Sequence, residues 1–171
     1  MFLASTRVSI WKRSPGSDGA RVVGADVLED RALAVADELD IEIVDPGSAI
    51  EVPCDVFSPN ALGGLLHDLS LSRLRCKIVA GGANNQLARM LVGDELHDMG
   101  VLYTPDFVIN AGALVRGTIF HLERRREPVE AIGKRIGAVA ERILECALEE
   151  DDAPARVAIR LAEAQIAEWR D

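Results

Sequence analysis

Asparagine side chains stand near the ends of apolar runs at three places in this chain. They are Asn60, the pair Asn84 and Asn85, and Asn110. An amide offers both a hydrogen-bond donor and an acceptor without carrying a charge. If the apolar runs are parallel strands, their carboxyl ends meet at one edge of a sheet. Proteins with open parallel α/β sheets bind nucleotides at that edge. Asparagine in a loop also serves as a plain turn residue that bonds to the nearby backbone, and both interpretations stay open.

Asp26 is a candidate for the acid that hydrogen-bonds an adenosine ribose. It follows the apolar run Arg21–Ala25, and in dinucleotide-binding folds such an acid stands about 20 residues after a glycine-rich loop. Counting back reaches Thr6, where there is no glycine, and Gly16 and Gly19 come directly before the next strand. No helix whose amino end could hold a pyrophosphate follows these glycines. The alternative role for Asp26 is a helix N-cap or a loop acid.

Apolar runs and helical spacing alternate along the chain from residue 20 onward. The expected strands are 20–27, 41–44, a run ending at 57–59, 77–80, 101–103 and 107–109, and the expected helices are 28–39, 69–74, 86–99, 129–147 and 159–169. Parallel strands need crossovers of about a dozen residues, so this alternation predicts a doubly wound, mostly parallel α/β sheet followed by C-terminal helices. If residues 6–11 are also a strand, residues 12–19 are too few for a helical crossover.

The composition is that of a soluble globular domain. The chain has 171 residues, of which 49% are apolar and 27% charged, and its net charge is −9. This acidic balance argues against a nucleic-acid surface, because the basic run Arg124–Arg126 stands between Glu123 and Glu127 and is typical of a solvated helix face. No run approaches the roughly 18 apolar residues of a membrane helix, and the N-terminus does not have the form of a signal peptide. We therefore expect a cytoplasmic protein.

Cysteine and histidine show no spacing typical of a metal site. Cys54, Cys76 and Cys146 are far apart and embedded in apolar sequence, which favours buried free thiols over a disulfide. The histidines are equally scattered, at His67, His97 and His121. We expect no bound metal ion.

Segments 54–64, 79–87 and 103–112 resemble, in order and spacing, the glutamate/leucine/phenylalanine/valine dehydrogenase family. The resemblance is to the C-terminal NAD-binding domain, with the leucine and valine dehydrogenases as the nearest members. It implies a Rossmann-like domain over residues 20–171, preceded by an unmatched segment at 1–19. It also implies oxidative deamination of an L-amino acid to a 2-oxo acid and ammonia, with hydride transfer to NAD. Asp26 favours NAD over NADP, since a carboxylate repels a 2′-phosphate.

The resemblance also assigns roles to single residues. The loop Ser58–Gly63 would lie along the nicotinamide ribose, Asn84 or Asn85 would bond that ribose or the carboxamide, and Asn110 would sit between nicotinamide and substrate. The expected cofactor-binding residues are Asp26, Pro59, Ala61, Leu62, Gly63, Asn84, Asn85 and Asn110, the last of which would also contact the substrate. The sequence departs from the family at Ala113 and Arg116, which leaves the identity of the amino-acid substrate open.

The family's catalytic lysines belong to an N-terminal domain that this sequence does not match. The only lysines here are Lys12, Lys77 and Lys134, and none stands in the family's glycine-flanked motif. We therefore assign no catalytic residue and expect the chain alone to be inactive, since a base poised near neutral pH requires the cleft between both domains. Two explanations compete for the degenerate first strand and glycine loop: a truncated reading frame, or a domain that closes its sheet differently.

Two rival functions remain open. The chain could be a non-catalytic module that docks onto a full-length paralogue, or onto a second copy of itself, through its C-terminal helices, because exposed core surface promotes pairing. It could also be an unrelated Rossmann-like enzyme such as a methyltransferase, but that class would require the same missing glycine-rich loop.

Overall fold

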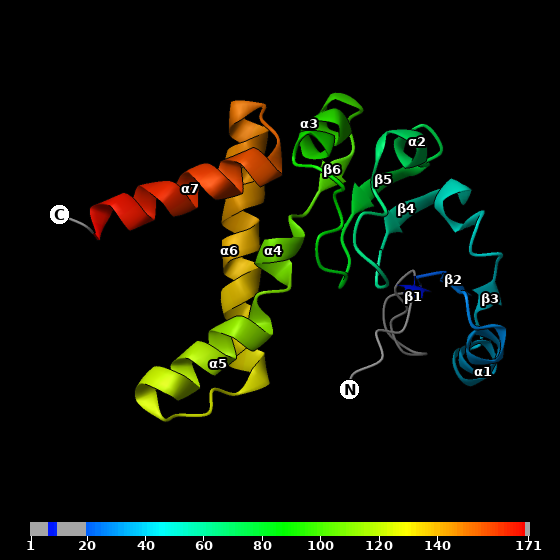
Figure 1. The fold of residues 1–171 in the computed structure, drawn as a ribbon, viewed down its shortest axis with the longest axis horizontal. Helices are drawn as coiled ribbons and strands as arrows, with labels where there is room; N and C mark the ends of the chain where they lie inside the picture. Colours follow the sequence, from blue (N-terminus) through cyan, green and yellow to red (C-terminus); the bar gives the residue numbers. More distant parts are fainter. Residues whose placement is uncertain (1–6, 10–19, 170–171) are drawn as a thin grey trace. The chain divides into compact units, whose positions relative to one another are not determined.

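The computed structural model describes residues 7–9 and 20–169, and its helices and strands alternate as the sequence predicts (Figure 1). In chain order, the elements are β1 (Arg7–Ser9), β2 (Val23–Asp26), α1 (Glu29–Leu39), β3 (Glu42–Ile43), a short 3-10 turn η1 (Ala49–Glu51), β4 (Cys54–Phe57), α2 (Asp68–Leu71), β5 (Cys76–Val79), α3 (Leu91–Asp98), β6 (Leu102–Tyr103), α4 (Asp106–Ile109), α5 (Gly112–Glu123), α6 (Val129–Glu150) and α7 (Pro154–Glu168). They form two compact units, Met1–Arg89 and Met90–Asp171.

In the first unit, β2 and β3 are parallel strands joined by α1. Val23 is in register with Glu42, and Gly24 with Ile43. Gly24 leaves room for the side chains of Ile41 and Ile43, each of which would stand 3.2 Å from a Cβ at that position. The strand β1 pairs with the other edge of β2, but antiparallel to it. The rest of the unmatched segment, residues 1–6 and 10–19, lies outside the described residues.

The parallel pair β4 and β5 carries the buried centre of the first unit. Its register places Cys54 opposite Cys76 and Phe57 opposite Val79. Phe57 and Val79, at the carboxyl ends of the strands, are at most 1% exposed, whereas Asp55, two residues before Phe57, is exposed. Alternate residues of a strand point to opposite faces, so Asp55 and Phe57 share a face that is solvated at one end and buried at the other.

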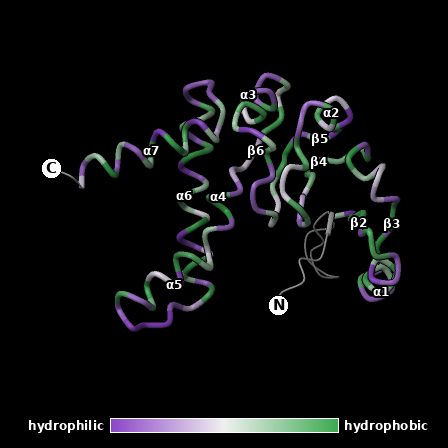
Figure 2. Tube along the Cα trace, in the orientation of Figure 1, coloured by the Kyte–Doolittle hydropathy of each residue, from purple (hydrophilic) through white to green (hydrophobic). Residues whose placement is uncertain are grey.

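In the second unit, the apolar face of α6 packs against α7, which crosses it (Figure 1). Ile143 and Ala147 of α6 form a buried cluster with Val157 and Ala158 of α7. Hydrophilic and hydrophobic residues alternate along α6 in Figure 2, as expected for a helix with one buried stripe. The predicted apolar spacing is confirmed for α6 at Ile132, Ile143 and Ala147, whereas α7 is buried through Val157 and Ala158 and the residues predicted for its apolar face, from Ile159 to Trp169, are exposed.

One predicted strand is wrong. Residues 107–109 belong to the short helix α4, which begins after Pro105. A short apolar run does not distinguish a strand from a helix by periodicity, and here the local cue is Pro105 followed by Asp106 at the first helical position. The helix expected over 86–99 is also shorter than predicted, since α3 begins only at Leu91. Residues 81–87 form a structured loop instead.

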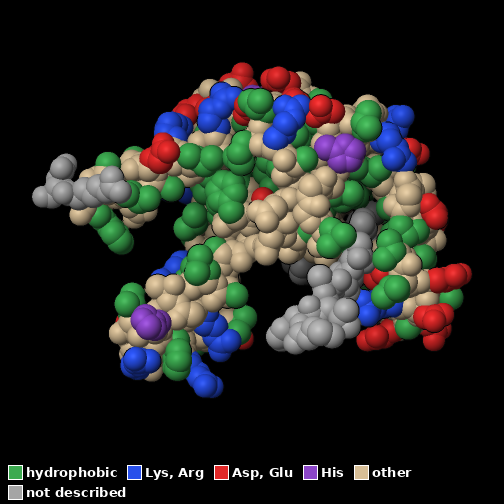
Figure 3. All heavy atoms as spheres, viewed as in Figure 1, with side chains coloured by type: hydrophobic (Ala, Val, Ile, Leu, Met, Phe, Trp, Pro, Cys, Tyr) green, Lys and Arg blue, Asp and Glu red, His purple; other side chains and the backbone are tan. Residues whose placement is uncertain are grey.

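Acidic side chains gather around α1. In Figure 3, Asp and Glu side chains gather on the face formed by this helix, which begins with Glu29 and Asp30. Such a surface repels the phosphates of nucleic acids.

Within residues 7–9 and 20–169, no helix has the length and apolar character needed to cross a membrane.

Candidate functional site

The loop after β4 is fixed by the side chain of Asn60. Its Nδ2 donates hydrogen bonds to the Ser58 carbonyl oxygen at 2.9 Å and to Ser58 Oγ at 3.0 Å. Its Oδ1 accepts a hydrogen bond from the backbone N–H of Gly82 at 2.7 Å. Asn60 therefore joins the loop after β4 to the loop after β5. This matches the turn-residue interpretation of that asparagine more than a role in contacting a ligand.

The loop after β5 is fixed from within by Gln86, which is fully buried. Its Nε2 donates to the carbonyl oxygens of Gly81 at 2.7 Å and Ala83 at 2.9 Å. Gly81 packs so closely that a Cβ there would stand 2.1 Å from the Pro59 carbonyl oxygen. No role for Gln86 was predicted from the sequence. The feature that could have indicated one is its long amide side chain, which stands at the end of a stretch of smaller residues that begins at Gly81.

Backbone hydrogen bonds then join the two loops directly. The N–H of Ala83 donates to the carbonyl oxygen of Pro59 at 2.9 Å, and the N–H of Gly64 donates to that of Asn85 at 2.7 Å. Further along both loops, Leu66 and Leu87 pair in an isolated parallel β-bridge. We call residues 58–64 and 80–86 the shelf. It is a pair of interlocked loops at the carboxyl ends of two parallel strands.

The outer rim of the shelf combines amides with an apolar surface. Asn84 and Asn85 are both exposed, and Leu62 is 56% exposed. Asn85 has a φ of 54°, in the left-handed region that asparagine tolerates better than most residues. An apolar rim bordered by amides suits a flat ring that carries a carboxamide. The structure thus brings together Pro59, Ala61, Leu62, Gly63, Asn84 and Asn85 of the expected cofactor-binding set.

Asp26 lies at the carboxyl end of β2, as expected. One of its carboxylate oxygens accepts a hydrogen bond from the N–H of Leu28 at 2.9 Å. This is the local turn that the alternative interpretation describes, because Leu28 is the N-cap residue of α1 and makes no side-chain cap of its own. The bond occupies one oxygen of the carboxylate, so it does not decide between the two roles.

Asn110 belongs to the second unit, where it ends α4. Its N–H donates to the carbonyl oxygen of Asp106 at 2.9 Å. Asp106 is itself buried, and its Oδ1 accepts a 2.6 Å hydrogen bond from the hydroxyl of Tyr103. Burial, together with this bond, raises the pKa of Tyr103. The turn that carries Asn110 is therefore anchored in the core of its unit, while its expected place beside the nicotinamide remains a prediction.

Lys77 has the environment of an ion-pair partner. Its Nζ lies 2.8 Å from Asp55 Oδ1, and both side chains are exposed. The hydrogen bond and the charge of Asp55 raise the pKa of Lys77, whereas a catalytic base requires a pKa lowered toward neutrality. Within the described residues, no group of three or more His, Cys, Asp or Glu side chains could hold a metal ion.

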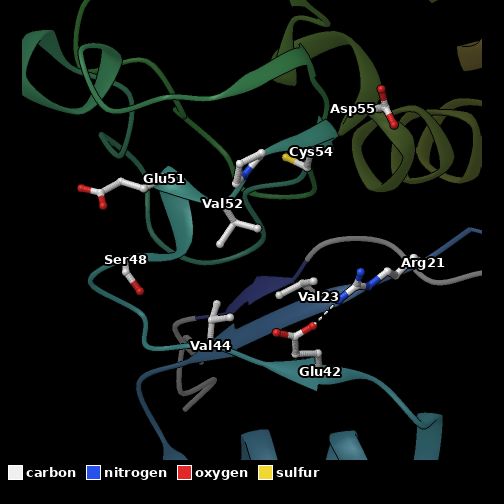
Figure 4. Close-up of a pocket in the computed structure, with 10 residues that line it drawn as sticks. Arg21, Val23, Glu42, Val44, Ser48, Glu51, Val52, Cys54 and Asp55 are labelled. Carbon is white, nitrogen blue, oxygen red and sulfur yellow. Dashed lines mark hydrogen bonds and ion pairs between the residues drawn. The ribbon is translucent and has the colours of Figure 1, made fainter.

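A cavity of about 560 Å³ lies at the amino ends of β2, β3 and β4. Figure 4 shows Val23 and Val44 on one side of it and Val52 and Cys54 on the other. The ion pair between Arg21 and Glu42, at 2.8 Å, stands at its rim. Because the shelf lies at the carboxyl ends of β4 and β5, this cavity is a separate feature from the candidate site.

Comparisons with known proteins agree with the resemblance. Residues 20–123 match the family model described as Glutamate/Leucine/Phenylalanine/Valine dehydrogenase. Over 161 residues, the chain is 34% identical to a leucine dehydrogenase of Geobacillus stearothermophilus, covering 90% of this chain and 42% of that protein. It is 36% identical over 161 residues to a valine dehydrogenase of Streptomyces albus, covering 90% of this chain and 43% of the relative.

A solved structure supports the same relationship. The crystal structure of L-tryptophan dehydrogenase from Nostoc punctiforme matches with a TM-score of 0.80 at 32% identity, over 86% of this chain and 45% of that one. The likeness confirms the predicted Rossmann-like α/β class. The chain spans less than half the length of each of these relatives.

Proposed function

Because the chain belongs to the glutamate/leucine/phenylalanine/valine dehydrogenase family, we propose that residues 20–171 are the NAD-binding part of a cytoplasmic L-amino-acid dehydrogenase. The observation that carries the proposal is the shelf, where two interlocked loops at the ends of parallel strands present Asn84 and Asn85 to solvent. NAD bound there would supply the acceptor for the hydride that leaves the amino acid in its deamination to a 2-oxo acid.

The residues of the shelf would bind and orient the nicotinamide half of the cofactor. Pro59, Ala61, Leu62 and Gly63 would contact the nicotinamide ribose, and Asn84 or Asn85 would hydrogen-bond that ribose or the carboxamide. Asn60 and Gln86 would act as positioning residues, since their side chains hold the loops rather than face the rim. Fixed donors of this kind lose little entropy when a ligand binds.

Two further residues would complete the site. Asp26 would accept hydrogen bonds from the adenosine ribose with the carboxylate oxygen that Leu28 does not occupy. Asn110 would stand between nicotinamide and substrate, where an uncharged amide stabilises developing charge without adding its own. Its anchoring through Asp106 and Tyr103 supports such a fixed orientation.

Catalysis would also require groups outside this chain. The chain covers 42% of the leucine dehydrogenase it matches, and Lys77 is committed to an exposed ion pair. In dinucleotide-binding folds the pyrophosphate lies on a glycine-rich loop, and the sequence shows no such loop about 20 residues before Asp26. The chain alone would therefore bind nicotinamide nucleotide weakly and would not turn over.

The test is to mix the purified chain with NAD and with leucine, valine or phenylalanine, and to follow the absorbance of reduced nicotinamide alongside calorimetric titration of NAD. We expect a dissociation constant of about 1 mM and no turnover. The variant Asn85→Gly removes the amide and still permits the left-handed backbone, so it should weaken binding with little change in melting temperature. Turnover would contradict the proposed incompleteness, and absence of binding at 10 mM NAD, about ten times the expected constant, would contradict the site.

Exposed apolar side chains on the second unit favour a second candidate function. Leu114 and Leu122 of α5 are 74% and 73% exposed, and Leu148 of α6 is 73% exposed. Exposed apolar side chains gain free energy when two protein surfaces associate and bury them, so the chain could serve as a non-catalytic module that binds a full-length paralogue or its own copy. Light scattering of the pure chain, and co-purification with a tagged paralogue, would distinguish these partners from a monomer.

A further inference from the structure

Cys54 and Cys76 stand opposite each other on neighbouring parallel strands. The register of β4 and β5 pairs these two residues directly. One position further along, Lys77 Nζ reaches Asp55 Oδ1 at 2.8 Å, which shows that opposing side chains of this ladder meet. The two cysteines lie on the other face, because side chains alternate along a strand. Cys146 is on α6 in the second unit and has no such partner among the described cysteines.

The spacing of the two strands fits a covalent bridge. Paired strands lie about 4.8 Å apart, within the Cα separations of about 4.4–6.8 Å found in disulfides. Burial raises the pKa of Cys76, the charge of an ionised Cys54 raises it further, and the backbone N–H of Phe57 on β4 lowers it.

Small solutes can reach Cys54. Cys54 lines the 560 Å³ cavity together with Val23 and Val52, and Figure 4 shows it at the cavity wall. Both thiols are half-buried and free. Neither has a role in the proposed cofactor site.

We propose that Cys54 and Cys76 form a dithiol site that reacts with small disulfides of the glutathione type and closes a bridge between β4 and β5. The Cys54 thiolate attacks one sulfur of oxidised glutathione, forming a mixed disulfide and releasing one glutathione thiolate. The Cys76 thiolate then attacks Cys54 Sγ, forming the internal disulfide and releasing the second glutathione. The two cysteines lose two electrons and two protons, the protons pass to solvent, and one oxidised glutathione becomes two reduced molecules.

The bridge would tie the two strands together only a few residues before the shelf loops. It would thus stabilise the first unit while leaving the amides of the rim in place. In a reducing compartment an accessible bridge is reversible, which is the behaviour of redox-responsive rather than structural disulfides.

The first test counts thiols after exposure of the whole chain to oxidised glutathione. Burial raises the pKa of both thiols, so the exchange is run at pH 8.5. We expect the free thiols of the wild-type chain, which has three cysteines, to fall to one, with a Cys54–Cys76 cross-link found by mass spectrometry. Cys146→Ser should lose both remaining thiols, whereas Cys76→Ser should stop at glutathione bound to Cys54. Three unreacted wild-type thiols, a halt at the mixed disulfide, or a bridge that includes Cys146 would each overturn the proposal.

A second test needs no substitution and so does not depend on the variants folding. Phenylarsine oxide bonds two thiols only when they are adjacent. We expect one equivalent to protect Cys54 and Cys76 of the native wild-type chain from N-ethylmaleimide, while Cys146 is still alkylated. Alkylation of all three cysteines in the presence of the arsenical would overturn the proposal.

Discussion

The shelf and the carboxyl end of β2 are both strand ends that the proposed cofactor would contact, and they are held in different ways. The shelf is fixed across its two loops by Asn60 and by backbone bonds such as Gly64 to Asn85, and Gln86 holds the second loop from within. At the end of β2, the side chain of Asp26 makes a local bond to Leu28, two residues away. The nicotinamide half of the proposed site is therefore preorganised within this chain.

The adenosine half depends on more than Asp26. In dinucleotide-binding folds, the pyrophosphate lies on a glycine-rich loop at the amino end of a helix, and the ribose acid acts beside that loop. The chain offers Asp26 and no matching glycine loop in its sequence. We therefore expect this chain alone to bind the nicotinamide half of the cofactor more tightly than the adenosine half.

The largest effect is expected for Gly81→Ala, which breaks the shelf by steric overlap. The new methyl group would stand 2.1 Å from the Pro59 carbonyl oxygen and 2.5 Å from the Pro59 nitrogen. We expect the free energy of unfolding to fall by about 3 kcal/mol or more in urea titrations. The matched control is Gly117→Ala in α5, which meets nothing within 4 Å and should be neutral or stabilising by up to about 1 kcal/mol. Equal effects of the two variants would show that the shelf is not tightly packed.

Asn60→Ala should destabilise the shelf less, since it removes hydrogen bonds without introducing overlap. It leaves the Gly82 N–H and the Ser58 carbonyl without the partners that Asn60 supplies. We expect a loss of about 1–3 kcal/mol, measured by urea unfolding. Asn84→Ala, at an exposed position of the same shelf, should cost less than about 0.5 kcal/mol. The reverse order of these two losses would contradict the roles assigned to them.

Alkaline pH should lower the free energy of unfolding of the first unit through Cys76. This residue begins β5, the strand that leads into the shelf residues 80–86. Burial raises the pKa of this thiol from 9.0 to about 11 in the folded chain. Between about pH 9 and 11, the unfolded chain therefore loses a proton that the folded chain retains, and the free energy of unfolding falls as the pH rises. The slope should stay well below the limit of about 1.4 kcal/mol per pH unit, because the thiol is only half-buried.

The control for this pH dependence is Cys76→Ser. Tyr103 and Cys54, whose pKa values are also raised, contribute alkaline destabilisation of the same sign to both proteins, so the difference between them reports the Cys76 thiol and its coupling to Cys54. Urea midpoints at pH 8 and pH 10.5 should separate more in the wild-type chain than in the variant. Identical separations would mean that Cys76 is as exposed when folded as when unfolded.

The smallest effect is expected for Lys77→Ala, at an exposed position of β5. The Lys77 and Asp55 side chains are 80% and 82% exposed, so water screens their attraction. The urea midpoint should remain unchanged, in low salt and in 1 M NaCl, where the Debye length is about 3 Å. A loss as large as that of Asn60→Ala would show that the exposed ion pair contributes to the stability of the β4–β5 pair as strongly as a part-buried hydrogen-bonded amide does.

The sequence predicted the elements better than the contacts between them. The strands β2, β4 and β5 were predictable because each is an apolar run that stops at small or polar residues, and the exposed rim was predictable because Asn84 and Asn85 follow such a run. The helix α4 was not, because three apolar residues after a proline fit either structure. The pairing of Cys54 with Cys76 depends on strand register, which is set by packing between segments far apart in the chain. The bonds from Gln86 to Gly81 and Ala83 are local, but they depend on the burial of this side chain inside its loop.

Amide chemical-shift mapping of the isotopically labelled chain with nicotinamide mononucleotide tests the central claim most directly. This ligand carries only the half of NAD that the shelf is proposed to bind, and AMP serves as the matched ligand for Asp26. We expect nicotinamide mononucleotide to change the amide chemical shifts of residues 58–64 and 80–86, and AMP to leave these chemical shifts unchanged. Shifts confined to other parts of the chain, or none at saturating ligand, would contradict it.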